Sequence, residues 1–495
     1  MEERIECKQL LNRVATAKEA ATLIQNGMTV AVGGYTSSGY PKVIAQELVQ
    51  RKRNGEPLQI RLLSGANDGP LDTLFAEEEM LSWRAPMIES KVLAKQVNAG
   101  KVHYVEQKMN KMPQLIQDGV FGKINVAVVE ALRITKEGHL IPTSSIGMNS
   151  HLLEEADAII VEINTAQPIT LDGMHDVFLP GSPPNRQAIP LTAVDQKIGL
   201  PYVKVDRNKI RYIVHSDVLD TPAPLGESKE QNKQIAANLL QFLTTEEMSK
   251  KPLPPFQTGF GNLVHEIVTA MSQSQLNDIT FFCGGLQEAH MELIAAGRVK
   301  AASTGSIQMT PRVITLLEEN PELFRKKVII RNGDITNHGE PISRLGLICL
   351  NSGLEMDIYG NVNSSHISGT KVLNGIGGGA NFAENAGLSI FLIGAESKGG
   401  KISNIVPFVT HQDISEHDID VVITENGVAD LRGKDDIQRA REIIAHCASP
   451  NYKDALTDYL DRAISECGGH HPHLLAEAFL WHIRLKEIGT MQDSI

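Results

Sequence analysis

The segment "ITFFCGGLQEAHMELIAAG" (Ile279–Gly297) joins an apolar run, a pair of glycines and a helical pattern in direct succession. A short apolar run bounded by turn residues predicts a buried strand, and the residues after the glycines predict a helix. A corner between strand and helix is where an α/β enzyme usually places a reactive side chain. Here the corner residues are Gly284 and Gly285, which have none. The segment therefore predicts an α/β fold. Its glycine pair raises the question of whether a catalytic residue is missing from this corner.

Runs of the same kind alternate with helical patterns along the rest of the chain. Met28–Gly55 reads as a strand, a glycine-rich loop and an amphipathic helix that starts after Pro41. Other predicted strands lie in Gln59–Ala66, Ile124–Leu132, Asp157–Asn164, Lys327–Gly333 and Asp420–Gly427. Buried strands separated by helices predict an α/β architecture with much parallel sheet.

The two halves of the chain show a weak tandem duplication. Ile124–Gly147 parallels Leu345–Gly369: both run from a strand through a glycine turn to a serine-rich loop. Two related open α/β domains in tandem would place the active site at their junction. We expect an N-terminal domain over residues 1–225, a connecting segment over 226–250 with a helix in Gln234–Met248, and a C-terminal domain over 251–495.

Composition narrows the class of protein. With 495 residues the chain is too long for one compact core. The formal net charge of −12 argues against nucleic-acid binding, which requires a basic face. The five scattered cysteines fit a reducing compartment, so we expect a cytoplasmic protein. No apolar run approaches the ~20 residues of a membrane span, and the first residues do not resemble a secretory signal.

Four glycine-rich loops each follow a predicted strand or open a helix. Glycine lets a backbone come close to a ligand and present N–H groups to an anion. The last loop also carries Lys398 and Lys401, so the set indicates a phosphate-bearing ligand. No P-loop is present, and no strand directly precedes the G-x-G of the third loop, so a dinucleotide fingerprint is disfavoured. The loops are Gln257–Asn262, Phe282–Glu288, Asn374–Phe382 and Ser397–Asn404.

Two long runs carry a resemblance to a known family. They are "RLGLICLNSGLEMDIYGNVNSSHISGTKVLNGIGGGANFAENAGLSIFL" (Arg344–Leu392) and "KGGKISNIVPFVTHQDISEHDIDVVITENGVADLRG" (Lys398–Gly433). With "FQTGFGNL" and further stretches, they resemble the class I coenzyme A transferases, in particular the acetyl-CoA hydrolase/transferase family. The resemblance covers nearly the whole chain. It implies two similar α/β domains, acyl-CoA and a small carboxylic acid of the acetate, propionate or succinate type as substrates, no cofactor besides coenzyme A as substrate, no metal, and a homodimer.

The resemblance also assigns site residues. The loop Thr258–Asn262 matches the family loop near the thioester, with Phe260 where a small aliphatic residue is more usual. Gly378 matches a glycine whose N–H faces the thioester oxygen, and Asn337 and Glu425 match polar residues that line the reacting centre. Without the resemblance, Glu425 would be a strand-end acid and Asn337 an Asx turn. The implied coenzyme A-binding set is Thr258, Gly259, Phe260, Gly261, Asn262, Asn374, Gly378 and Lys398.

One position departs from the family pattern. The family opens this helix with an aromatic residue, a small residue, a catalytic glutamate, and then a glutamine and an acid. A gap-free match puts Phe282, Gln287 and Glu288 on retained positions and Gly284 on the glutamate. That glutamate is the nucleophile that carries the acyl group and then coenzyme A. The α chain of citrate lyase, a distant relative, resembles this chain in having a glycine pair there.

The missing nucleophile leaves several hypotheses. The acceptor acid could attack the thioester directly in a ternary complex, with Asn337 and Glu425 orienting it and N–H groups near Phe260 and Gly378 holding the oxyanion. Water could attack instead, with Glu425 as base, or the protein could only bind acyl-CoA. Replacement nucleophiles are disfavoured, because strand alternation points Cys283 away and Glu288 matches an acid that the family already has. The tract Cys467–His473 lacks the carboxylates of a catalytic metal site.

Overall fold

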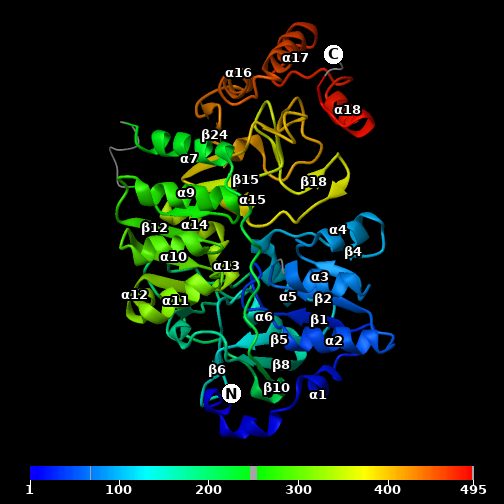
Figure 1. The fold of residues 1–495 in the computed structure, drawn as a ribbon, viewed down its shortest axis with the longest axis vertical. Helices are drawn as coiled ribbons and strands as arrows, with labels where there is room; N and C mark the ends of the chain where they lie inside the picture. Colours follow the sequence, from blue (N-terminus) through cyan, green and yellow to red (C-terminus); the bar gives the residue numbers. More distant parts are fainter. Residues whose placement is uncertain (67–68, 246–252, 493–495) are drawn as a thin grey trace. The chain divides into compact units, whose positions relative to one another are not determined.

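The computed structural model describes residues 1–66, 69–245 and 253–492 (Figure 1). The chain forms two compact units. Unit 1 comprises Met1–Pro224 and Asn277–Leu345, and unit 2 comprises Leu225–Leu276 and Gly346–Ile495. The segment Asn277–Leu345 thus belongs to the same unit as the N-terminal part of the chain. The domain boundaries expected near residues 225 and 250 stay a prediction. The predicted connecting helix corresponds to α7 (Glu230–Leu243), while its expected end at Met248 lies outside the described residues.

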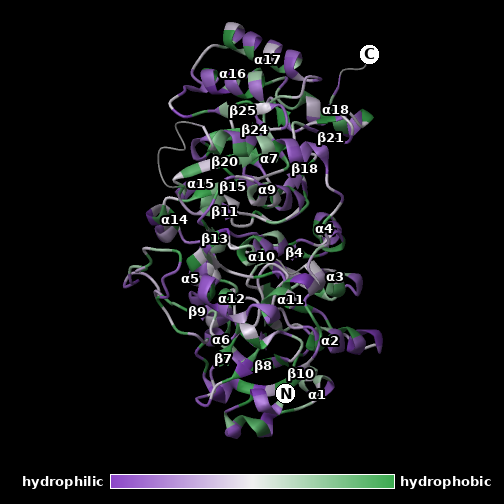
Figure 2. Ribbon diagram, turned by 60° about the vertical axis from the view of Figure 1, so that its left-hand side comes forward, coloured by the Kyte–Doolittle hydropathy of each residue, from purple (hydrophilic) through white to green (hydrophobic). Residues whose placement is uncertain are grey.

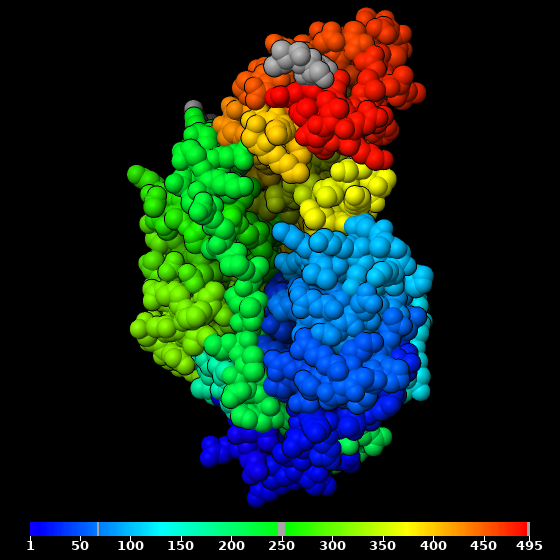
Figure 3. All heavy atoms as spheres, turned by 45° about the vertical axis from the view of Figure 1, so that its right-hand side comes forward, coloured from blue at the N-terminus to red at the C-terminus, as the bar shows by residue number. Residues whose placement is uncertain are grey.

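The first sheet of unit 1 is parallel throughout, as the buried apolar runs predict. Its strand order is β10-β8-β5-β1-β2-β3-β4. The strands are β1 (Thr29–Val32), β2 (Ile60–Ser64), β3 (Leu81–Ala85), β4 (His103–Tyr104), β5 (Ile124–Ala131), β8 (Ala156–Asn164) and β10 (Ile210–Ser216). The helices around them are α1 (Ala17–Ala21), α2 (Val43–Arg53), α3 (Gly69–Glu77), α4 (Lys91–Asn98), α5 (Met112–Gln117) and α6 (Asn149–Glu155). In the space-filling view the N-terminal residues, in blue, form one continuous packed surface (Figure 3).

Unit 1 contains a second group of parallel strands, in the order β12-β13-β14-β9. They are β9 (His175–Asp176), β12 (Ile279–Cys283), β13 (Val299–Thr304) and β14 (Val328–Arg331). Their helices are α10 (Glu288–Ala295), α11 (Pro311–Glu319), α12 (Pro321–Lys327), α13 (Gly333–Thr336) and α14 (Gly339–Leu345). β12, the two glycines and α10 confirm the strand, corner and helix predicted for Ile279–Gly297.

Unit 2 has strands in the order β25-β24-β20-β15-β11, parallel except for β25. They are β11 (Phe256–Thr258), β15 (Ile348–Ser352), β20 (Leu388–Leu392), β24 (Val421–Thr424) and β25 (Gly427–Asp430). Its other helices are α9 (Asn262–Gln273), α15 (Gly379–Asn385), α16 (Asp436–His446), α17 (Lys453–Glu466) and α18 (Leu480–Ile488). Helices such as α17 carry both hydrophobic and hydrophilic residues (Figure 2), and α17 buries Leu456, Tyr459, Leu460 and Ala463.

Short antiparallel pairs complete both units. In unit 1, β6 (Arg133–Ile134) pairs with β7 (Leu140–Ile141). In unit 2, β18 (His366–Ile367) pairs with β19 (Lys371–Val372), and β21 (Glu396–Ser397) with β22 (Ile402–Ser403). β16 (Glu355–Asp357) lies between β17 (Val362–Asn363) and β23 (Ile405–Val406). The α/β class expected from the sequence is thus confirmed. Within the described ranges, no helix combines the length and apolar character needed to cross a bilayer.

Candidate active site

The glycine corner after β12 is open to a side chain. The φ angle of Gly284 lies outside the left-handed region, so its backbone suits any L-residue. A Cβ atom built there would lie 3.7 Å from the Tyr35 hydroxyl and 3.9 Å from Tyr35 Cε1, which are ordinary contacts. Neither the backbone nor the available space therefore requires glycine at position 284.

Tyr35 is the side chain that faces this corner. It lies in the glycine-rich loop after β1, and it is 3% exposed. Its ring fits between two further glycines: a Cβ at Gly305 would lie 3.1 Å from Tyr35 Cε1, and one at Gly333 would lie 2.8 Å from Cε2. Burial raises the pKa of Tyr35 far above its usual value, so the phenol is neutral. Tyr35 lies in the glycine-rich loop predicted within Met28–Gly55, where no local pattern marks it as a site residue.

Asn337, predicted to line the reacting centre, contacts the same hydroxyl. Its Nδ2 donates to the Tyr35 hydroxyl oxygen at 2.5 Å and to the Gly333 carbonyl at 3.1 Å. Because a carbonyl oxygen can only accept, the second contact fixes which end of the amide is nitrogen. Asn337 is 1% exposed. Tyr35 thus links Gly284 and Asn337, two positions that the sequence analysis had assigned to one site.

The loop that carries Tyr35 turns sharply at its tip. Tyr35 and Ser38 exchange backbone hydrogen bonds of 3.0 and 3.2 Å, while Thr36 and Ser37 have φ angles of 54° and 59°. A left-handed conformation costs roughly 1–2 kcal/mol for an L-residue, so other contacts must hold this turn. One is the 2.6 Å hydrogen bond between Thr36 Oγ1 and Ser306 Oγ. The Ser306 hydroxyl lies 3.5 Å from the Gly284 carbonyl oxygen, so the turn is attached to the corner that it faces.

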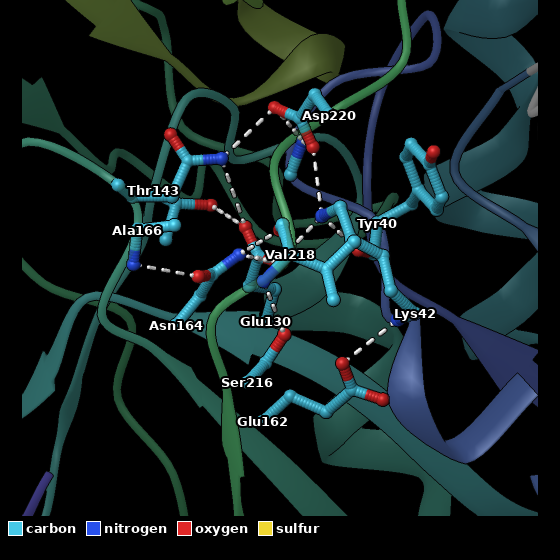
Figure 4. Close-up of polar contacts among 12 residues, drawn as sticks. Tyr40, Lys42, Glu130, Thr143, Glu162, Asn164, Ala166, Ser216, Val218 and Asp220 are labelled. Carbon is cyan, nitrogen blue, oxygen red and sulfur yellow. Dashed lines mark hydrogen bonds and ion pairs between the residues drawn. The ribbon is translucent and has the colours of Figure 1, made fainter. Parts of the chain in front are cut away.

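A buried ionic cluster anchors the other end of the loop (Figure 4). Lys42 Nζ lies 2.6 Å from Glu130 Oε2 and 2.8 Å from Asp220 Oδ1, and all three side chains are almost fully buried. Asp220 also accepts from the Gly39 backbone N–H at 3.1 Å, and Glu162 accepts from the Lys42 backbone N–H at 2.7 Å. Buried charges are tolerated only when paired in this way. Burial raises the pKa of Glu130 to about 7, although Lys42 opposes the shift.

In unit 2, the loop predicted to bind coenzyme A connects β11 to α9. Thr258 ends the strand and is 1% exposed, whereas Phe260 is half-buried. Gly261 has a φ of 105°, a conformation that favours glycine. A Cβ at Gly259 or Gly261 would meet no described atom within 4 Å, so this backbone can be approached closely. Asn262 Oδ1 accepts from the Gly226 N–H at 2.9 Å.

The remaining predicted residues lie on loops of unit 2. Asn374 is half-buried, and its Nδ2 donates to the Ser364 carbonyl at 2.9 Å. Gly378 is half-buried and directly precedes α15. Lys398 is exposed between β21 and β22, where its ammonium group is accessible to a phosphate.

Glu425 directly follows β24, and its carboxylate is fixed at both oxygens. Gln231 Nε2 on α7 donates to Oε1 at 2.7 Å, and the Ala395 backbone N–H donates to Oε2 at 2.9 Å. The predicted residues therefore fall into two sets: Gly284 and Asn337 in unit 1, and all the others in unit 2. The assignment of both sets to one catalytic site stays a prediction.

The His-rich tract after α17 contacts both α16 and α17. His471 Nδ1 lies 2.6 Å from Asp436 Oδ2, and the Tyr459 hydroxyl lies 2.9 Å from His473 Nδ1. Within the ranges 1–66, 69–245 and 253–492, no group of three or more His, Cys, Asp or Glu side chains is arranged to hold a metal ion.

The predicted site residues lie in two largely parallel α/β units, on glycine-rich loops and at the ends of strands. The family model of the acetyl-CoA hydrolase/transferase N-terminal domain matches residues 1–217, and that of the C-terminal domain matches residues 315–460. The chain is 38% identical to the succinyl-CoA:acetate CoA-transferase of Clostridium kluyveri, over 99% of this chain and 92% of that protein. The protein therefore belongs to the acetyl-CoA hydrolase/transferase family, as the resemblance implied.

Other relatives are named either as coenzyme A transferases or as acetyl-CoA hydrolases. The propanoyl-CoA:succinate CoA transferase of Escherichia coli is 36% identical over 96% of this chain and 98% of its own length. The acetyl-CoA hydrolase of Kluyveromyces lactis is 35% identical over 99% of this chain and 98% of its own length. The family thus includes proteins named as transferases and proteins named as hydrolases.

Solved structures confirm the fold. RipA from Yersinia pestis superposes with a TM-score of 0.69 at 18% identity, over 90% of this chain and 96% of that one. The putative α subunit of citrate lyase from Streptococcus mutans, in complex with citrate, gives a TM-score of 0.61 at 19% identity, over 93% of this chain and 86% of that one.

Proposed function

We propose that this enzyme transfers coenzyme A between a short-chain acyl-CoA and a small carboxylic acid within a ternary complex. The observation that carries the proposal is Gly284: the corner has room for a side chain and a backbone that permits one, yet it has none. Relatives named for succinyl-CoA, acetate and propanoyl-CoA support short acyl groups. A cytoplasmic location and a homodimer, both expected from the sequence, are part of the same proposal.

In the proposed reaction the two substrates supply all the reacting groups. One oxygen of the acceptor carboxylate attacks the thioester carbonyl, and the carbon–sulfur bond breaks to give a mixed anhydride and the coenzyme A thiolate. The thiolate then attacks the acceptor carbonyl of the anhydride and expels the donor acid as a carboxylate. No proton is gained or lost overall. Holding both substrates in place replaces the tether that a covalent intermediate would provide.

Residues from both predicted sets have roles in this proposal. The loop Thr258–Asn262, whose backbone can be approached closely at Gly259 and Gly261, and the amine of Lys398 bind coenzyme A. The Gly378 N–H stabilises the oxyanion. Glu425 and Asn337 line the reacting centre. The two hydrogen bonds on Glu425 hold its carboxylate in one orientation, which a positioning or basic group needs.

Hydrolysis is the second candidate, favoured by the relatives named acetyl-CoA hydrolase. In that case water takes the place of the acceptor acid, and Glu425 acts as the base. A panel of acyl-CoAs and acids, read by mass spectrometry with a no-acid control, separates the two. Transfer predicts a new acyl-CoA that forms only when its acid is present. Equal coenzyme A release with and without acid would establish hydrolysis, and no turnover at all would leave a binding protein.

Lys398 provides a test of coenzyme A binding alone. We expect Lys398→Ala to weaken binding by about 1.5–3 kcal/mol, the value of a hydrogen bond to a charged group. Isothermal titration calorimetry with coenzyme A measures this, and Lys486→Ala, which removes another exposed lysine of unit 2, is the matched control. Absence of binding by the wild type, or equal affinities of both variants, would contradict the assignment of Lys398.

A further inference from the structure

We propose that the Tyr35 hydroxyl binds the carboxylate of the acceptor acid at the Gly284 corner. This inference rests on the proposed function and names the group that holds the second substrate. One acceptor oxygen receives a hydrogen bond from Tyr35, and the other oxygen attacks the thioester. Tyr35 thereby positions an external carboxylate at the corner where the family resemblance places an enzyme carboxylate.

The location of the hydroxyl carries the proposal. It lies 3.7 Å from the position that a Cβ atom would occupy at Gly284, so a group seated against this glycine lies beside it. Gly284 is partly exposed, whereas Tyr35 is buried behind it. Tyr35 is the side chain nearest to the Gly284 Cβ position, so a small acid that occupies this position lies next to the phenol.

The hydrogen-bonding state of the phenol suits a donor. Asn337 Nδ2 has only protons to offer, so the Tyr35 oxygen is the acceptor in their 2.5 Å contact. The phenol's own proton is therefore not used by Asn337. The Thr336 side chain also hydrogen-bonds to this hydroxyl, so an acid oxygen at the corner takes the phenol proton in competition with Thr336. A nucleophilic role is disfavoured, because burial raises the pKa of Tyr35 and keeps it protonated. A neutral O–H group that meets a carboxylate forms a charge-assisted hydrogen bond.

The surroundings of the ring hold the hydroxyl in place. Gly305 and Gly333 leave just enough room for the ring, since a Cβ at either position would lie 3.1 Å or less from it. The strained turn at Thr36 and Ser37 fixes the backbone beside it, and Thr36 is bonded to Ser306 at 2.6 Å. A rigid donor loses little conformational entropy when a ligand binds, which favours positioning of a small acid.

Tyr35→Phe tests the proposal, because it removes the hydroxyl and leaves the ring between the two glycines. We expect kcat/KM for the acceptor acid to fall by about 10–100-fold, while KM for acyl-CoA changes by less than about threefold. The matched control is Tyr40→Phe, which removes the hydroxyl of a buried tyrosine in the same loop. It should leave both parameters close to those of the wild type. Thermal unfolding of each variant reports on folding.

The outcomes separate this inference from the proposed function. Wild-type transfer with an unchanged acid dependence in Tyr35→Phe would overturn the role of Tyr35 and leave the proposed function standing. Equal losses for acid and acyl-CoA, with a lower unfolding temperature, would show a structural role and also overturn it. Absence of transfer by the wild type would overturn both.

A second variant covers the case in which Tyr35→Phe does not fold. Gly284→Val adds a branched side chain next to the hydroxyl and should displace the acid without touching the ring. A similar selective loss of kcat/KM for the acid supports the proposal. An unchanged acid dependence in folded Gly284→Val would overturn it, because the acid would then bind elsewhere.

Discussion

Two strands of unit 1 end in glycine pairs, and the glycines serve different purposes. After β1, a Cβ at Gly33 would lie 2.6 Å from Asn149 Oδ1, and Gly34 has a φ of 106° with Tyr40 backbone atoms 3.0–3.2 Å from its own Cβ position. After β12, Gly284 has neither constraint. Packing requires glycine at the first corner, and the open space at the second suits a ligand. A glycine in the sequence therefore does not by itself show whether packing excludes a side chain at that position or whether the position is open to a ligand.

The largest expected effect lies in the ionic cluster that anchors the loop of the first corner. Lys42→Met leaves Glu130 and Asp220 buried without their cation, which should cost about 3–5 kcal/mol of unfolding free energy. Urea unfolding measures the loss. The control is Lys123→Met, which breaks a surface pair with Asp157 and should cost at most about 1 kcal/mol. Similar losses in both variants would show that the cluster does not stabilise the first corner.

The same variant should respond to pH in one direction. Burial raises the pKa of Glu130 from 4.5 to about 7 in the folded protein, and Lys42 opposes this rise. Without Lys42 the folded-state pKa rises further above the unfolded value, so the folded state binds the extra proton more readily. Stability then falls as pH rises through this window, and the loss in Lys42→Met should be smaller near about pH 5 than near about pH 8. The opposite trend would contradict the pairing.

Gly34→Ala should have the next largest effect. A left-handed alanine costs roughly 1–2 kcal/mol, and crowding against the Tyr40 backbone costs roughly 1–3 kcal/mol more. Urea unfolding should therefore show a loss of about 2–5 kcal/mol. A loss below about 0.5 kcal/mol would mean that the first corner tolerates side chains as the second one does.

The smallest effect is expected at the second corner. Gly284→Ala adds a Cβ at ordinary contact distance in a backbone that suits alanine. Its unfolding free energy should lie between unchanged and about 1 kcal/mol more stable, because alanine lowers the entropy of the unfolded chain. A loss comparable to that of Gly34→Ala would break the comparison and make Gly284 a structural glycine.

The sequence predicted local structure well because the signals were local. The apolar run of β12, the glycine pair and α10 are continuous in the chain, as are the glycine loop after β1 and the helix α2 that begins at Val43. The family motifs also assigned Asn337 and Glu425 to the reacting centre, and these two assignments stay predictions. Strands, corners and helices of this kind are each determined by a short stretch of sequence, so hydrophobic periodicity and turn residues are enough to predict them.

The roles of Tyr35 and Lys42 could not be predicted in the same way. Tyr35 and Asn337 are 302 residues apart, and Lys42 and Glu130 are 88 residues apart. No local pattern reports which distant loops fold onto one another. The only local signal for Tyr35 was an aromatic residue inside a glycine-rich loop after a strand. Its role can be inferred only from the structure, which places its hydroxyl next to Gly284. Contacts of this kind arise from tertiary packing rather than from propensity.

Initial-rate kinetics with acyl-CoA and acid varied together test whether the transfer proceeds without a covalent intermediate on the enzyme. We expect double-reciprocal lines that intersect, because both substrates must be bound before the acyl group moves. Parallel lines would contradict it, since they require an enzyme-bound intermediate that Gly284 cannot form.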